Sequence, residues 1–158
     1  MKQLLKHLMA RYGTEHDSEK VSESIQEKYR KSGLTEEQAF LIRQKINHAL
    51  EGDKLYRNNE MGLGELANYI QQDRYKVSEV INTYYAMNFY ALLNSYRINE
   101  AKYLLITNPL LSVKAIMYEV GFNSKNSFYL AFKRDTGLSP NDFRTIESYN
   151  YHSAQLAS

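Results

Sequence analysis

The sequence contains no cysteine among its 158 residues. Disulfide bonds, catalytic thiolates and cysteine-ligated zinc or iron–sulfur centres are therefore excluded. Nothing in the cysteine usage marks a secreted protein, so the cytoplasm is the expected location. No apolar run approaches the roughly 18 residues that cross a bilayer, and charges interrupt the N-terminal stretch too often for a secretory signal. These absences predict a chain that neither crosses a membrane nor carries an export signal.

Proline and glycine are also scarce, with two and seven residues. Few chain breakers and long stretches of 3.6-residue apolar spacing predict an all-α fold. Catalytic patterns are missing as well, because the four histidines are scattered without an HExxH pair. The glycines at 62 and 64 have no preceding strand and no GKS-type phosphate motif. We therefore expect no enzymatic activity, no metal site and no cofactor.

Residues 1–62 are predicted to form a helical lead-in that ends in a polar loop. Within them, residues 17–31 carry one narrow apolar stripe, typical of a linker or a docking surface, formed by Val21, Ile25 and Tyr29. Thr35 and Gln38 have the spacing of a capping box that opens the next helix. The polar segment 54–62 then predicts a domain boundary.

One helical plan occurs twice after residue 62. Residues 63–85 and 112–135 each read as a helix of about eight residues, a short turn and a second helix. This is the organisation of a helix-turn-helix, whose second helix can enter the DNA major groove. A helix over residues 89–106 joins the two units and spans roughly 27 Å. With the width of each unit added, the two second helices would lie about one DNA turn, near 34 Å, apart.

Local signals place the ends of several of these helices. Asp73 is predicted to cap the second helix of the first unit, and Ser124 that of the second unit. A last short helix is expected to end at Phe143. Residues 147–158 have no clear period, and we expect them to form a disordered tail.

Residues 120–144, VGFNSKNSFYLAFKRDTGLSPNDFR, resemble the signature of the AraC/XylS transcription regulators. The matching residues are Val120, Gly121, Phe122, Ser124, Phe128, Phe132, Lys133, Arg134, Gly137, Ser139, Pro140, Phe143 and Arg144. Upstream matches are Leu66, Ala67, Leu93, Asn94, Arg97, Ile98, Ala101, Leu104, Leu105 and Ile116. The resemblance covers residues 63–146, just over half the chain. It implies a DNA-binding domain of two helix-turn-helix units joined by a connecting helix.

The resemblance also implies which residues face DNA. Carried over by position, they are Arg74, Tyr75, Lys76, Ser78, Glu79 and Asn82 in the first unit, and Ser124, Lys125, Asn126, Ser127, Tyr129, Lys133 and Arg134 in the second. Arginine and lysine can donate to guanine or phosphate, asparagine can pair with adenine, and glutamate can accept from cytosine N4. Three positions depart from the family pattern: Leu130 replaces a frequent arginine, Met117 a small residue and Ala86 a turn glycine.

The sequence thus predicts a transcription regulator, or the DNA-binding output part of a larger one, whose partner is an operator in double-stranded DNA. The charge gives weak support, since residues 63–147 carry nine Lys and Arg against eight Asp and Glu, a net +1. The alternative is a helical interaction module that acts through a protein such as RNA polymerase. Residues 1–62 are expected to connect to a sensor domain or to pair in a homodimer.

Overall fold

The computed structural model describes residues 33–156. Their secondary structure is helical and contains no strand, which confirms the all-α prediction. Among the described residues, those from Ile42 onward form one compact body, which contains every helix after the first. The predicted stripe of Val21, Ile25 and Tyr29 lies outside the described residues. In the part of the chain that the structure describes, no helix is long and apolar enough to cross a membrane.

The first described helix, α3, spans Glu36–Asn47 and begins at the predicted capping box. The Gln38 amide donates to Thr35 Oγ1 at 3.2 Å, and the Thr35 amide donates to Gln38 Oε1 at 3.4 Å. The helix continues into a π-helical turn, η1 (His48–Gly52), and a 3₁₀ turn, η2 (Leu55–Arg57), follows. The sequence predicted a loop and a domain boundary here, but η2 belongs to the same compact unit as the helices that follow it.

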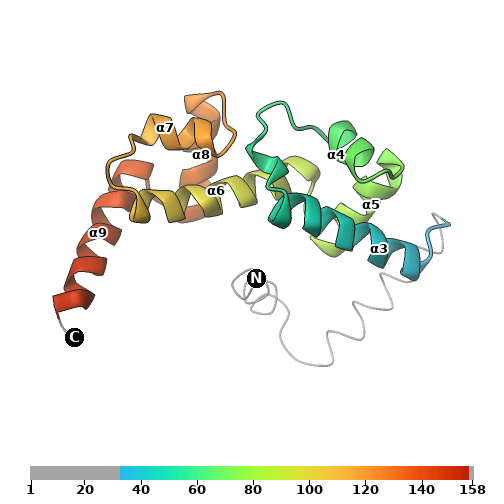
Figure 1. The fold of residues 1–158 in the computed structure, drawn as a ribbon, viewed down its shortest axis with the longest axis horizontal. Coiled ribbons are helices and arrows are strands. Elements are labelled where there is room, and N and C mark those ends of the chain that lie inside the picture. Colours follow the sequence, from blue (N-terminus) through green and yellow to red (C-terminus); the bar gives the residue numbers. More distant parts are fainter. Residues whose placement is uncertain (1–32, 157–158) are drawn as a thin grey trace. The chain divides into compact units, whose positions relative to one another are not determined.

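Six further helices follow η2 in the order that the repeat predicted (Figure 1). They are α4 (Leu63–Tyr69), α5 (Arg74–Tyr84), α6 (Phe89–Thr107), α7 (Val113–Glu119), α8 (Lys125–Thr136) and α9 (Pro140–Leu156). The pairs α4–α5 and α7–α8 are the two helix-turn-helix units, and α6 is the predicted connecting helix. We call α5 and α8 the recognition helices.

The first helix-turn-helix unit, α4–α5, is stabilised by a cap at the start of α5 and by a buried apolar core. The Asp73 carboxylate accepts hydrogen bonds from the amides of Tyr75 and Lys76 at 2.9 and 3.1 Å, which confirms the predicted cap of α5. Its core consists of Leu66, Ala67, Ile70, Val77, Val80 and Ile81, all buried. Ala86, after α5, has a left-handed backbone with φ of 52°, the conformation that favours glycine. The residue is therefore tolerated there at some cost in backbone strain.

The second unit has the larger aromatic core. Phe122, Phe128 and Phe132 pack together with ring centroids 5.3 to 5.7 Å apart, against α6 residues such as Leu105. Met117, one of the departures from the family pattern, is buried in this cluster. The predicted cap of α8 is confirmed, because Ser124 Oγ accepts from the Ser127 amide at 3.4 Å.

The last helix is longer than the sequence predicted. A short helix ending at Phe143 and a disordered tail were expected, but α9 continues through Leu156. No proline or glycine follows Pro140, so nothing in the local sequence forces the helix to stop. The prediction was wrong because it took the absence of an apolar period as the absence of a helix.

Candidate nucleic-acid interface

The two recognition helices match residue by residue. Their buried positions have the same spacing, with Val77, Val80 and Ile81 in α5 and Phe128, Ala131 and Phe132 in α8. Their N-caps, Asp73 and Ser124, differ by 51 positions, as do the buried residues. Each exposed residue of α5 therefore has a counterpart 51 positions later in α8, on the same face of its helix.

The expected DNA-facing residues lie mainly on the faces away from the core. In α5, Arg74, Tyr75, Lys76 and Asn82 are exposed, and Ser78 and Glu79 are half-buried. In α8, Lys125, Asn126, Ser127, Lys133 and Arg134 are exposed, and Tyr129 is half-buried. Tyr129 also has a packing role, because its ring meets that of Phe128 edge to face at 5.8 Å. Ser124 acts through its cap, and its hydroxyl is already engaged with the helix backbone.

The charge on these faces is more positive than the charge of the whole domain. The recognition helices carry Arg74, Lys76, Lys125, Lys133 and Arg134, and their acidic residues are Glu79 and Asp135. Asp135 is neutralised by Lys102 of α6, whose ammonium lies 2.7 Å from its carboxylate. The two recognition helices therefore carry five cations, and Glu79 is their remaining acidic residue once Asp135 is paired with Lys102. This local excess suits a polyanionic partner.

A buried arginine joins η2 to the second helix-turn-helix unit, α7–α8. Arg97 of α6 donates from Nε to the Tyr56 carbonyl at 2.7 Å and from Nη2 to the Asn58 carbonyl at 2.8 Å. Its guanidinium also lies 5.3 Å from the centre of the Phe122 ring. Burial lowers the pKa of Arg97 from its ordinary value, but the group stays charged at neutral pH. Arg97 therefore fixes both the backbone of η2 and the turn of the second unit.

An acidic residue one turn further along α6 completes this junction. Glu100 accepts hydrogen bonds from Tyr56, Arg57 and Lys54, the last at 3.1 Å. Burial opposes ionisation of Glu100, but these hydrogen bonds outweigh it and lower its pKa to about 2. Arg57 also reaches α7, where its Nη1 lies 3.1 Å from Glu119. The turn η2 is thus bonded to both α6 and α7.

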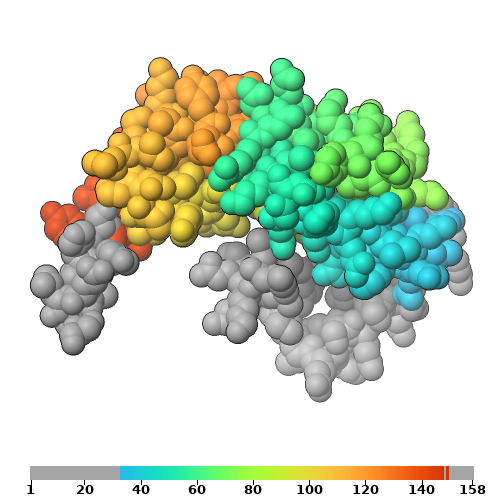
Figure 2. All heavy atoms as spheres, in the orientation of Figure 1, coloured from blue at the N-terminus to red at the C-terminus, as the bar shows by residue number. Residues whose placement is uncertain are grey.

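The residues before η2 contact the first helix-turn-helix unit, at the end of α5. The guanidinium of Arg43 lies 5.0 Å from the centre of the Tyr84 ring, and Tyr85 donates to Asn47 Oδ1 at 2.6 Å. Burial raises the pKa of Tyr85 to about 12, so this hydroxyl remains a donor at neutral pH. We call residues 43–58 the bridging segment, because they contact both helix-turn-helix units. Figure 2 shows this stretch (teal to green) lying between the yellow-green and the orange helices.

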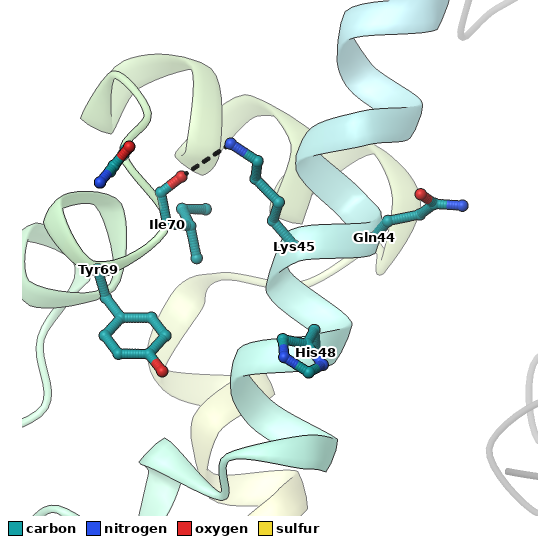
Figure 3. A pocket seen from close by; sticks show the side chains of 6 residues that line it. Gln44, Lys45, His48, Tyr69 and Ile70 are labelled. Atoms are coloured by element: carbon teal, nitrogen blue, oxygen red, sulfur yellow. Dashed lines mark hydrogen bonds between the residues drawn. The ribbon is translucent and has the colours of Figure 1, made fainter.

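A shallow pocket lies where α3 meets the end of α4 (Figure 3). It has a volume of about 540 Å³ and is lined by Gln44, Lys45, His48, Tyr69, Ile70 and Gln71. The Lys45 ammonium crosses it to donate to the Ile70 carbonyl at 3.1 Å. This bond satisfies a carbonyl at the C-terminal end of α4, where a cation is favourable. The lining therefore serves the packing of α3 on α4.

The sequence singled out exposed residues of both recognition helices as candidates, but it gave no sign of the residues that hold η2 against the two helix-turn-helix units. In the sequence, Arg97 is visible only as a match to the family signature, and no motif marks Arg57 or Glu100. Their partners lie about 40 residues away in the chain, so no local pattern indicates the contacts. Among the residues described, no group of three or more His, Asp or Glu side chains could hold a metal ion.

The reported relatives of this chain are helix-turn-helix transcriptional regulators. A family model described as a helix-turn-helix domain matches residues 66–146. A helix-turn-helix transcriptional regulator of Staphylococcus aureus strain MSSA476 is 26% identical over 129 residues, which are 75% of this chain and 17% of the relative. The transcriptional activator RhaR of Salmonella heidelberg is 35% identical over 78 residues, which are 49% of this chain and 24% of RhaR. The chain therefore spans less than a quarter of these relatives' length.

Solved structures share the fold. The C-terminal domain of AraT, a response regulator from Geobacillus stearothermophilus, has a TM-score of 0.59 at 24% identity, covering 67% of this chain and 84% of that one. The C-terminal domain of the two-component response regulator yesN from Fusobacterium nucleatum has a TM-score of 0.58 at 24% identity, covering 65% and 96%.

Two helix pairs joined by one connecting helix define a bipartite helix-turn-helix protein. Proteins of the helix-turn-helix class bind DNA by placing the second helix of the pair in the major groove. With its signature and the matching family model, the chain belongs to the AraC/XylS family of helix-turn-helix transcription regulators. The relatives are transcriptional regulators, which are a non-enzymatic class.

Proposed function

We propose that this chain is a sequence-specific DNA-binding transcription regulator, or the DNA-binding output part of a larger one. In this proposal, residues 63–146 read an operator in double-stranded DNA through two successive major grooves, one for each recognition helix. The observation that carries it is the repeated pair α5 and α8, each capped, packed on one face and exposed on a polar face with an excess of cations. Such a function would place the protein in the cytoplasm with the DNA that it binds.

The contacts divide into two kinds. Backbone amides in the first turns of α5 and α8, together with Arg74, Lys76, Lys133 and Arg134, are suited to phosphates and would fix the position of the protein on the duplex. Asn126 and Asn82 are suited to adenine, and Glu79 to cytosine N4. Affinity would come mainly from the first group and sequence preference from the second.

Residues 1–62 would link this domain to the rest of a regulator. The length of the relatives supports a further domain, because the chain matches less than a quarter of each. A second copy of this chain is the other partner that these residues could take. Their bridging segment contacts both helix-turn-helix units, so a change upstream would reach both of them.

Selection from a pool of random duplexes with the full chain tests the proposal. We expect enrichment of two short sequence blocks about ten base pairs apart, one for each major groove. A variant carrying Asn82→Ala and Asn126→Ala is the control, and it should lose both blocks while keeping its helical content. No enrichment would contradict direct operator reading and would favour the alternative, an interaction module that acts through RNA polymerase.

A further inference from the structure

Leu130 is a large apolar side chain on the exposed face of α8. It is 72% exposed and lies on α8, on the face opposite the buried residues Phe128 and Phe132. Asn126 and Lys133 stand four positions before it and three after it, so all three share that face. Leu130 is therefore at the centre of the surface that α8 would present to DNA.

A single exposed leucine needs no special explanation by itself. Here the surroundings matter, because Lys125, Lys133 and Arg134 make this face cationic and its acid, Asp135, is paired with Lys102. A cationic helix face selects a polyanion as its partner. The prominent apolar group that a helix meets in the major groove of DNA is the C5-methyl group of thymine.

The first unit differs at the same position. Counting 51 residues back from Leu130 gives Glu79, which lies at the matching place on α5 between Tyr75 and Asn82. A carboxylate accepts from the cytosine amino group and has no affinity for a methyl group. The two units therefore present opposite chemistry to the base pair at the centre of each contact.

We propose that Leu130 determines specificity by packing against the methyl group of a thymine, whereas Glu79 reads a cytosine at the equivalent place of the other half-site. The inference rests on the proposed DNA-binding function and adds to it. It makes the operator asymmetric in a defined way, with an A·T pair central to the α8 half-site and a G·C pair central to the α5 half-site.

Uracil in place of thymine tests this directly, since it removes only the methyl group. With the full chain and the duplex enriched by selection, each thymine is replaced in turn. We expect affinity to fall about fourfold at one position of one half-site, which corresponds to about 0.8 kcal/mol for one apolar carbon. Leu130→Ala should bind the thymine duplex about as weakly as the unaltered protein binds the uracil duplex, and should no longer distinguish the two.

Lys133→Ala is the matched control on the same helix face. It should weaken binding to both duplexes by the same factor and keep the fourfold difference, because a phosphate contact does not sense the methyl group. Leu130→Ala is not expected to unfold α8, because its side chain is mostly outside the core.

The outcomes separate the inference from the proposed function. If no thymine is sensitive to uracil, or if the sensitivity persists in Leu130→Ala, the inference is overturned while operator binding stands. If Leu130→Ala abolishes binding to every duplex, Leu130 supports the helix and does not read a base, which also overturns it. If no duplex is enriched at all, the proposed function fails, and the inference fails with it.

Discussion

Lys125 and Asn126 occupy the first turn of α8, where a recognition helix meets DNA first. Both side chains are exposed, and neither caps the helix, because Ser124 has that role. The Lys125 ammonium lies 5.3 Å from the centre of the Tyr129 ring, which restrains it beside the exposed face. Substitutions at these two positions should therefore change contacts with DNA while leaving the fold intact.

Asn126→Ala should weaken binding to the selected operator by roughly 1–3 kcal/mol, because a bidentate contact with adenine is lost. Lys125→Ala should have an effect of similar size. Competition between the operator and a scrambled duplex measures the change in specificity. Asn99→Ala, an exposed asparagine on the connecting helix α6, is the control and should bind like the unaltered protein. Unchanged specificity in Asn126→Ala would remove that residue from the interface.

Glu100 links the protonation state of one residue to the stability of the domain. Its pKa falls from an ordinary 4.5 to about 2, because hydrogen bonds from Arg57, Tyr56 and Lys54 outweigh the effect of burial. The depressed pKa means that the ionised form favours the folded state. This contribution is complete above about pH 4.5 and is lost as the pH falls toward 2.

Glu100→Gln should lower the free energy of unfolding at pH 7 by roughly 1–3 kcal/mol, since Arg57 and Lys54 lose their anionic partner. The difference from the unaltered protein should shrink between pH 4.5 and 2, as the native carboxylate becomes protonated. Urea unfolding at pH 7 and pH 3 measures it. Glu119→Gln, at a more exposed ion pair with Arg57, should cost less than 1 kcal/mol. An equal difference at both pH values would contradict this role of Glu100.

Helix starts could be predicted from sequence because their causes are local. Thr35, Asp73 and Ser124 each cap backbone amides two or three residues further on, so their role is visible in a few letters. The turn η2 could not be predicted in this way. Lys54 precedes it with a left-handed φ of 53°, and the bonds that hold η2 come from Arg97 and Glu100 on a distant helix.

The turn of the second unit depends on Gly121. Its φ is +94°, a conformation that side chains disfavour, and a Cβ there would lie 2.8 Å from the Arg57 carbonyl oxygen and even nearer that of Tyr56. The matching residue of the first unit, Gln71, also has a positive φ, of 54°. Gly121 thus serves two needs, the backbone turn and the close approach of η2.

Gly121→Ala should destabilise the domain by about 2 kcal/mol or more, because both the backbone strain and the clash with η2 must be relieved. Thermal unfolding monitored by circular dichroism measures this loss. Gly64→Ala is the matched control, because Gly64 lies inside α4 with open space around its Cβ position. It should be neutral or stabilise by up to about 1 kcal/mol. An unfolding temperature for Gly121→Ala equal to that of the control would contradict the close contact.

At the scale of the molecule, the bridging segment packs with both helix-turn-helix units although it lies before the residues that the family model matches. The family model begins at residue 66, whereas the contacts that join both units begin at Arg43. Sequence patterns gave the repeat, the connecting helix and the exposed candidate residues, since these depend on spacing along one helix. The bridging contacts join residues 38 to 62 positions apart, and only the folded chain brings them together.

The dependence of DNA affinity on salt tests the central claim most directly. The measurement is the slope of log K against log salt concentration for the full chain and the selected operator. If the five cations of α5 and α8 each displace one counterion, the slope should lie near −4 to −5, and Lys133→Ala should reduce its magnitude by about 1. A slope near zero, or equal affinity for operator and scrambled duplex, would contradict the proposal that this chain reads DNA through its recognition helices.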